Sequence, residues 1–256
     1  MNLFQAIILA FVQGLTEFLP LSSSGHLVLF QHFFNLGNPP VLFDVLLHLG
    51  TLGAILVFFR QDILFLFKEF RKKTGLWFLL IIASLPAGLF GYFLNKEVGQ
   101  IFGNLKLVGF MWLITGVLLF LTKFSKSKNN QKDNWGKIKI SDGLFIGFFQ
   151  ALALFPGLSR SGSTVSAGLF RKLSPELAFK FSFLLSIPAV LGANLLQIKE
   201  ISLVELNLGI AFFSLLVAGL TGYLTLILLK KVLIWQKFYY FGFYCLILGT
   251  VVLFLL

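Results

Sequence analysis

Long apolar runs separated by short polar segments form the main pattern along this chain. An α-helix needs ~20 residues to cross the hydrocarbon core of a bilayer, and six of these runs are interpreted as spans, the third of them being short. Transmembrane helices are therefore predicted at Pro40–Phe59, Gly75–Leu94, Leu107–Leu121, Pro175–Leu196, Leu208–Leu229 and Phe238–Leu256. Two further apolar stretches, Leu3–Phe34 and Gly143–Phe170, are broken near their middle by Pro, Ser and Gly.

The two broken stretches repeat one another. When the numbering is shifted by 137, the same residue type recurs at Gln13 and Gln150, Leu15 and Leu152, Phe18 and Phe155, Leu21 and Leu158, Ser22 and Ser159, Ser24 and Ser161, and Gly25 and Gly162. The chain is therefore interpreted as one integral membrane domain, 1–256, containing an internal repeat. The copies are residues 1–122 and 142–256, and a basic cytoplasmic loop, 123–141, joins them.

Each copy holds one broken stretch followed by three spans. Because three is an odd number, the second copy is inverted if each broken stretch enters and leaves the membrane by one side. Inverted repeats place their site near the bilayer midplane at discontinuous helices, where protein or a wet cavity surrounds the non-helical backbone. We therefore expect an all-α polytopic membrane protein with six transmembrane helices and two re-entrant helical hairpins, whose turns meet.

Composition and charge agree with a membrane protein. Hydrophobic residues make up 57% of the chain and charged residues only 12%, whereas soluble domains carry about 25% charged residues. Seventeen of the 21 Lys and Arg residues fall on one side of the predicted topology and three on the other. The positive-inside rule makes the basic side cytoplasmic and places both termini outside. The net charge of +11 therefore reflects topology, and no nucleic-acid partner is expected.

Few residues within the apolar runs can ionise. They are Glu17, His26 and Arg160 in the broken stretches, with Asp44 and His48 in the first predicted span. An ionisable group at membrane depth is costly and is therefore a functional candidate. A structural ion pair between Glu17 and Arg160 is the alternative. His48 is interpreted as structural, and Asp44 is left open between a supporting role and the orientation of the first hairpin. The single cysteine, Cys245, excludes an intrachain disulfide.

The second turn has the composition of an anion site. Arg160 lies between Ser159 and Ser161, and Gly162 follows. This set offers guanidinium, hydroxyl and backbone donors without a negative charge, and the planar fork of Arg suits phosphate. The helix that starts here would also direct free N–H groups at a bound anion. The alternative for the Ser and Gly residues is close helix packing.

The first turn offers complementary chemistry. Glu17 can act as a base or hold a metal ion, and His26 can act as a general acid or base. Ser22, Ser23 and Ser24 offer a hydroxyl nucleophile. Gln13 lies one helical turn before Glu17 and is expected on the same face. Together the two turns predict phosphoryl chemistry or phosphate binding on a substrate with a hydrocarbon tail.

The segments Gln13–Pro20, Ser22–His26 and Pro156–Thr164 resemble the undecaprenyl-diphosphatase family of bacitracin-resistance proteins, and the resemblance covers nearly the whole chain. It implies hydrolysis of undecaprenyl diphosphate to undecaprenyl phosphate and inorganic phosphate. This reaction recycles the lipid carrier for cell-wall synthesis in the bacterial cell membrane. The inversion that the charge count indicates predicts a site that opens to the extracytoplasmic face. The resemblance also implies a divalent cation, Mg²⁺ or Ca²⁺. Because Gln13 is neutral, only Glu17 is expected as a charged metal ligand.

The motifs assign roles to particular residues. Glu17, Ser23, His26 and Arg160 are the expected catalytic residues, with Ser23 or a water as the nucleophile and Gln13 in support. The expected phosphate-binding residues, besides Arg160, are Ser22, Ser24, Gly25, Ser159, Ser161, Gly162 and Thr164. Besides the lipid substrate and the bilayer, a homodimer partner is left open.

Two other function classes share parts of this pattern. The pattern of the type 2 phosphatidic-acid phosphatase superfamily requires a Pro before Ser-Gly-His and a His six residues after the Arg, where this chain has Ser23 and Ser166. A polyprenyl-phosphate flippase needs the same anion site, so transport remains the main alternative, alone or as a second activity.

Overall fold

The computed structural model describes residues 1–36, 41–68, 74–101, 104–125, 135, 138–197 and 207–255, and most of the predicted 123–141 loop lies outside them. The described residues form helices and no strands. The helices are α1 (Leu3–Phe18), α2 (Ser23–Phe33), α3 (Val41–Phe58), α4 (Arg60–Lys68), α5 (Thr74–Ile101), α6 (Leu105–Leu121), η1 (Thr122–Phe124), α7 (Ile140–Leu152), α8 (Arg160–Phe170), α9 (Pro175–Gln197), α10 (Leu208–Ile234) and α11 (Tyr240–Leu255).

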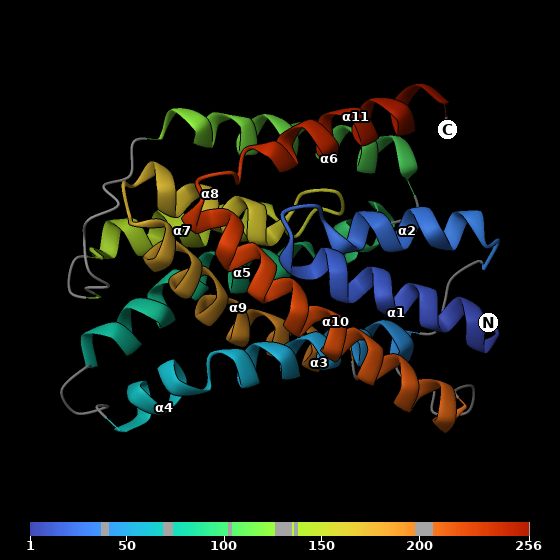
Figure 1. The fold of residues 1–256 in the computed structure, drawn as a ribbon, viewed down its shortest axis with the longest axis horizontal. Helices are drawn as coiled ribbons and strands as arrows, with labels where there is room; N and C mark the ends of the chain where they lie inside the picture. The colour runs from blue at the N-terminus through green and yellow to red at the C-terminus, as the bar shows by residue number, and fades with distance from the viewer. Residues whose placement is uncertain are drawn as a thin grey trace.

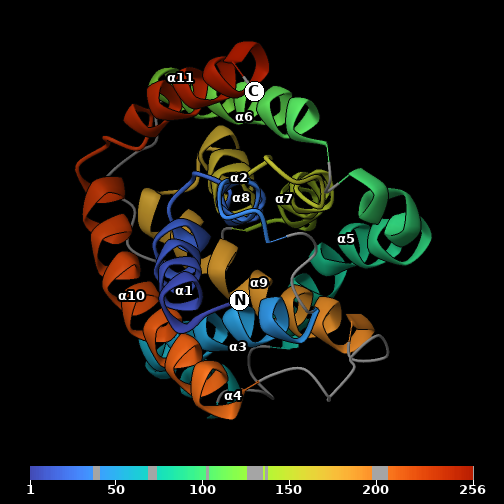
Figure 2. The same ribbon diagram turned by 90° about the vertical axis from the view of Figure 1, so that its right-hand side faces the viewer.

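The two broken stretches form helix pairs that enter the molecule from opposite ends. Both chain termini lie at one end; α1 runs from there to the middle and α2 returns (Figure 1). The α7–α8 pair starts from the other end in the same manner. Seen along the long axis, α2, α7 and α8 lie near the centre, with α3, α5, α6, α10 and α11 around them (Figure 2). The short helices are thereby enclosed by longer ones.

Four described helices are long and apolar enough to cross a membrane, namely α5, α6, α9 and α10. The pair formed by α3 and α4 passes as a fifth, although it bends by 68° at the break between its helices. The last predicted span corresponds to α11, a shorter apolar helix of 16 residues. The chain is therefore a polytopic membrane protein.

Two spans extend beyond their predicted ends. α5 continues past Leu94 to Ile101, and α10 continues past Leu229 to Ile234. The added residues include Lys96, Glu97, Lys230 and Lys231, which end a hydrophobic run but do not end a helix. Lys and Glu have good helix propensity, so the backbone can stay helical beyond the apolar run.

Polar residues set several helix starts. Asn2 and Gln5 form reciprocal bonds at the start of α1, both of 2.9 Å. Asn104 caps α6 and Asn207 caps α10 through their side-chain oxygens. Such caps satisfy backbone N–H groups that have no partner within the helix.

Small residues allow close helix crossings, as is usual where lipid rather than water surrounds the protein. At the α5–α7 crossing, Gly147 lies against the backbone carbonyl of Ala83. At the α6–α11 crossing, Gly116 and Gly242 face one another, and a Cβ at either would approach the other's carbonyl oxygen to 2.9 or 2.7 Å.

Gly147→Val is therefore expected to lower the melting temperature of the detergent-solubilised protein, because the new side chain overlaps the α5 backbone. Overpacking of this kind costs roughly 1–3 kcal/mol of unfolding free energy. Gly88→Val is the matched control, since a Cβ at Gly88 of α5 meets nothing within 4 Å. Equal melting temperatures for the two variants would contradict the proposed crossing.

Candidate active site

The two helix turns contact one another, as the sequence predicted. The Ser161 hydroxyl donates to the Leu19 carbonyl at 3.1 Å. The Gly157 N–H donates to Ser22 Oγ, also at 3.1 Å. The turn of the first helix pair is thereby bonded to the turn of the second, so groups more than a hundred residues apart in sequence share one region.

Helix α6 braces both turns. Trp112 Nε1 donates to the Leu21 carbonyl at 2.7 Å. Thr115 Oγ1 donates to the Gly157 carbonyl at 3.0 Å and accepts from the Ser159 N–H at 3.2 Å. Buried backbone groups outside regular helices need such partners. The turns are therefore held by side chains of a spanning helix.

Equivalent serines begin the second helix of each pair. Ser22 Oγ accepts from the Gly25 N–H at 3.4 Å, and Ser159 Oγ accepts from the Gly162 N–H at 3.1 Å. Ser22 also adopts a φ of 67°, a strained conformation for a residue other than glycine. Both copies of the repeat therefore have a serine side chain that caps the second helix. Of these two caps, only Ser22 has a strained backbone.

A buried cluster surrounds the Glu17 carboxylate. Arg160 Nη2 donates to Glu17 Oε1, and Ser23 Oγ donates to Glu17 Oε2, each at 2.6 Å. Gln13 Nε2 donates to Glu17 Oε2 at 3.1 Å, which confirms that the two side chains share a face of α1. The exposed fractions of the Glu17 and Arg160 side chains are 8% and 15%. The structure therefore brings together three of the four expected catalytic residues.

Two polar atoms of this cluster have unused bonding capacity. Arg160 Nη1 and Gln13 Oε1 are buried and have no hydrogen-bond partner in the part of the chain described. Buried polar groups are normally paired, so such atoms mark a place where a ligand can bind. The Arg160 guanidinium also lies 5.9 Å from the Phe183 ring centroid, and Phe183 packs edge-on against Phe18. The guanidinium is thus positioned by an aromatic surface as well as by Glu17.

His26 is bonded elsewhere. Its Nδ1 lies 2.8 Å from the Ser22 carbonyl oxygen, and its Nε2 lies 2.8 Å from the Tyr244 hydroxyl. The ring packs edge-on against Trp112, with centroids 5.1 Å apart. Its described bonds therefore link it to the first turn and to α11, and not to Glu17.

The histidine beside Glu17 is His48, which the sequence interpretation had treated as structural. His48 Nε2 lies 4.0 Å from Glu17 Oε2, and the imidazole side chain is 30% exposed. Its Nδ1 bonds the Asp44 carbonyl at 2.8 Å, while Asp44 Oδ1 is buried without a described partner. The spacing of Asp44 and His48 places both on one face of α3, but it does not indicate that this face meets Glu17 of α1.

The remaining predicted phosphate-binding residues are engaged within the turns. Ser22 and Ser24 hydroxyls lie 3.2 Å apart, as do those of Ser159 and Ser161. Thr164 Oγ1 donates to the Arg160 carbonyl at 2.8 Å and also bonds the Ser182 hydroxyl. These bonds hold the serine hydroxyls within their own turns and hold the Thr164 hydroxyl against α9.

Gly25 and Gly162, the two glycines predicted to bind phosphate, lie in close packing contacts. A Cβ at Gly25 would approach Trp112 to 2.8 Å and Gly157 Cα to 3.2 Å. A Cβ at Gly162 would meet Ser159 and Pro20 at 3.1 and 3.2 Å. The alternative of close packing therefore holds for these positions, whatever further role their backbone N–H groups have.

The donor set fits a hard divalent cation better than a zinc-type site. The described residues contain no group of three or more His, Cys, Asp or Glu side chains that could hold a metal. They do provide the Glu17 carboxylate and the unbonded Gln13 Oε1. Mg²⁺ is commonly bound by one or two carboxylates and completed by substrate phosphates and waters. Glu17 and Gln13 are the residues of the cluster with oxygen donors of this kind, and both Glu17 oxygens already accept hydrogen bonds from neighbouring side chains.

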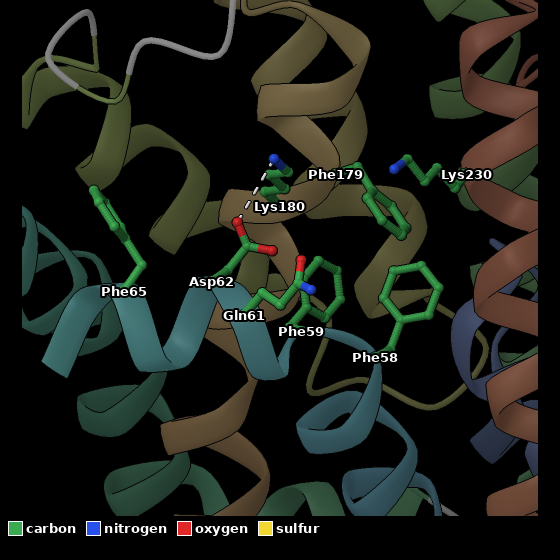
Figure 3. Close-up of a pocket in the computed structure, with 8 residues that line it drawn as sticks. All are labelled: Phe58, Phe59, Gln61, Asp62, Phe65, Phe179, Lys180 and Lys230. Carbon is green, nitrogen blue, oxygen red and sulfur yellow. Dashed lines mark ion pairs between the residues drawn. The ribbon is translucent and has the colours of Figure 1, made fainter. Parts of the chain in front are cut away.

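A separate hollow lies where α3, α4, α9 and α10 approach one another (Figure 3). Its volume is about 330 Å³, and Lys180 pairs with Asp62 across it at 3.6 Å. Its lining residues are Phe58, Phe59, Gln61, Asp62, Phe65, Phe179, Lys180 and Lys230. None of them is a predicted site residue. Phe59 and Phe179 pack against Phe183, so the hollow and the Glu17 cluster share an aromatic wall.

Comparison with known proteins identifies the family. Residues 6–251 match the family model described as Bacitracin resistance protein BacA. The chain belongs to the BacA family. It is 41% identical over 252 residues to the undecaprenyl-diphosphatase of Thermosipho africanus, an alignment that covers 97% of this chain and 98% of that protein. It is 43% identical over 261 residues to that of Carboxydothermus hydrogenoformans, with 99% and 97% covered. The resemblance expected from the motifs is confirmed.

Proposed function

We propose that this BacA-family protein hydrolyses undecaprenyl diphosphate to undecaprenyl phosphate and inorganic phosphate. The observation that carries the proposal is the buried cluster in which Arg160 and the Ser23 hydroxyl both bond Glu17. Relatives that match the chain over nearly its full length carry the name undecaprenyl-diphosphatase. The reaction would recycle the lipid carrier of cell-wall synthesis, which is the basis of bacitracin resistance. Nothing in these matches favours a flippase or a type 2 phosphatidic-acid phosphatase.

Substrate binding would use groups whose hydrogen-bond donors have no partner among the described residues. Arg160 Nη1 is buried and has no partner among the described residues, so the guanidinium can donate to a phosphate oxygen while it still contacts Glu17. The starts of α2 and α8 add hydroxyls and helix N-termini, which favour negative charge. The polyprenyl tail would remain in the surrounding lipid, since the diphosphate is the only part of this substrate that needs polar partners.

The Ser23 hydroxyl is the nucleophile that the geometry favours. It already donates to Glu17 Oε2 at 2.6 Å, so the carboxylate can take its proton as the oxygen attacks the terminal phosphorus. The bond from that phosphorus to the bridging oxygen breaks, undecaprenyl phosphate leaves, and a water then releases phosphate from Ser23. Arg160 offsets charge on the phosphoryl oxygens, and phosphoryl transfer depends mainly on such stabilisation. His26 is proposed as a second proton-transfer group.

Glu17 and Gln13 are the residues proposed to hold a divalent cation, Mg²⁺ or Ca²⁺. When bound, the cation would supply positive charge beside the phosphoryl oxygens. Gln13 is neutral, so the protein would supply only one carboxylate charge to the cation. The substrate phosphates would supply the remaining negative charge. Ser23 and Gln13 donate to the same oxygen of Glu17, so Ser23 would remain next to the bound cation.

The proposed topology has six transmembrane helices, α3, α5, α6, α9, α10 and α11, with α1–α2 and α7–α8 as re-entrant hairpins of an inverted repeat. Its support is the arrangement in Figure 1, where the termini share one end and α4, the end of α6, the start of α7 and the end of α10 lie at the other. The latter elements carry many of the basic residues. By the positive-inside rule, the termini and the opening of the site face outward from the bacterial cell membrane.

The test is phosphate release by the purified full-length protein in detergent with Mg²⁺ present. We expect inorganic phosphate to appear from undecaprenyl diphosphate in equal amount to undecaprenyl phosphate. Undecaprenyl phosphate offered as the starting lipid is the control and should yield no phosphate. Binding of the diphosphate without phosphate release would overturn the proposal and would favour lipid transport.

A further inference from the structure

Helix α11 contacts the first turn from outside the helix pairs through two side chains, and one of them, the Cys245 thiol, donates to the Pro20 carbonyl at 3.5 Å. Figure 2 shows α11 beside α6, and both helices lie above α2 and α8 in that view. From α11, the Tyr244 hydroxyl reaches His26 Nε2 at 2.8 Å. The two rings are nearly parallel, with centroids 5.8 Å apart and an interplanar angle of 10°. A residue 218 positions away in sequence is therefore the partner of the imidazole.

The bonding pattern determines the imidazole tautomer. Nδ1 faces the Ser22 carbonyl, which can only accept, so Nδ1 carries the proton in the neutral ring. Nε2 is then the acceptor, and the Tyr244 O–H donates to it. The Ser22 carbonyl also accepts from the His26 backbone N–H at 3.2 Å, so one oxygen accepts from two groups of His26.

Tyr244 is suited to positioning the His26 imidazole rather than to packing in the protein core. The residue is 44% exposed, whereas Gly242, Cys245 and Gly249 form the buried side of α11. A phenol hydroxyl on an apolar helix needs a polar partner, and His26 Nε2 provides it. Trp112 holds the imidazole on a second side, edge-on at 5.1 Å. Removal of the hydroxyl alone would leave the packing of α11 intact.

We infer that Tyr244 is a positioning residue for the phosphatase reaction, because its hydroxyl holds the His26 imidazole in one orientation and one tautomer. The inference rests on the proposed function, in which His26 transfers a proton. Tyr244 itself need not touch substrate. Because Nε2 accepts from the Tyr244 hydroxyl and Nδ1 donates to the Ser22 carbonyl, a proton enters the ring at Nε2 by way of that hydroxyl, which gives up its own proton and takes up another. The same bond fixes the ring between α6 and α11.

Tyr244→Phe tests this role, because it removes the hydroxyl and keeps the ring. We expect kcat for phosphate release to fall about tenfold, with KM changed less than about twofold, since one hydrogen bond is lost and the phosphate cluster is untouched. In protein labelled with ¹⁵N-histidine, the Nε2 signal of His26 should move while its Nδ1 signal stays. A His26→Gln sample assigns these signals among the three histidines. Tyr240→Phe, which removes a hydroxyl from an exposed position on the same helix, should leave both kcat and the His26 signals unchanged.

The outcomes separate this inference from the proposed function. An unchanged Nε2 signal in Tyr244→Phe would overturn the inference, whether or not the wild-type protein releases phosphate. A moved signal with an unchanged kcat would also overturn it, because the orientation of the ring would not matter for the reaction. If the wild-type protein releases no phosphate, the proposed function fails, while the spectrum still decides whether Tyr244 holds His26.

Discussion

Arg160→Ala is expected to lower phosphate release from undecaprenyl diphosphate by about a thousandfold or more, in the range seen when a single phosphate-stabilising arginine is lost. Arg160 is the cation in the buried cluster, and its unpaired nitrogen is the donor available to a phosphate oxygen. Arg160→Lys keeps the charge but loses the planar fork, so an intermediate rate is expected. The measurement is the initial rate of phosphate release in detergent.

The alanine variant also leaves Glu17 buried without its cation, which can destabilise a protein by about 3–5 kcal/mol. A double variant, Arg160→Ala with Glu17→Gln, removes both charges and should recover the melting temperature while phosphate release stays absent. Arg60→Ala, at an exposed position at the start of α4, controls for the loss of one positive charge. Wild-type rates in a folded Arg160→Ala protein would exclude the assignment of the anion site.

Glu17→Gln is expected to lower phosphate release by about a thousandfold, within the range usual for a general base. The variant keeps the size of the side chain but loses the negative charge that accepts from Ser23 and Arg160. It also removes the only carboxylate proposed to bind the cation. Wild-type activity should disappear on chelation with EDTA and return with Mg²⁺, whereas the residual activity of the variant should not respond to Mg²⁺.

Glu176→Gln is the matched control for Glu17, because it neutralises a partly exposed carboxylate that pairs with Lys230 on α10. Its rate and its Mg²⁺ response should equal those of the wild-type protein. If Glu17→Gln kept a full Mg²⁺ response while its rate fell, Glu17 would be a base and not a cation ligand. If its rate were unchanged, the proposed mechanism would be wrong at its central residue.

Much of the site was predictable because its chemistry is encoded in short segments. Gln13 and Glu17 are one turn apart in a helix, so their shared face follows from helical geometry alone. Ser22 and Ser159 lie at equivalent positions of the repeat, and both cap the second helix of their pair. The contact between the turns followed from the need to surround non-helical backbone with protein. Each of these inferences uses local spacing or a constraint imposed by the membrane.

The partners of the two histidines were not predictable in the same way. His48 lies near Glu17 because α1 and α3 both pack closely on α10, where Gly14 faces Ala218 and Gly50 faces Leu215. If α1 or α3 were rotated about its axis by one residue, its glycine would no longer face α10. Spacing within one helix does not reveal how three helices cross, and therefore His48 received a structural interpretation.

The sequence by itself determined the helical membrane class, the repeated turns and the residue types of a phosphate site, because hydrophobic length, helical periodicity and motif spacing are properties of the local chain. Only the tertiary structure decided which of those residues meet. It placed Ser23 and Arg160 on Glu17, His48 beside it, and His26 between Trp112 and Tyr244. These pairings depend on the rotation and crossing of helices from distant parts of the chain, and close packing at small residues sets that rotation.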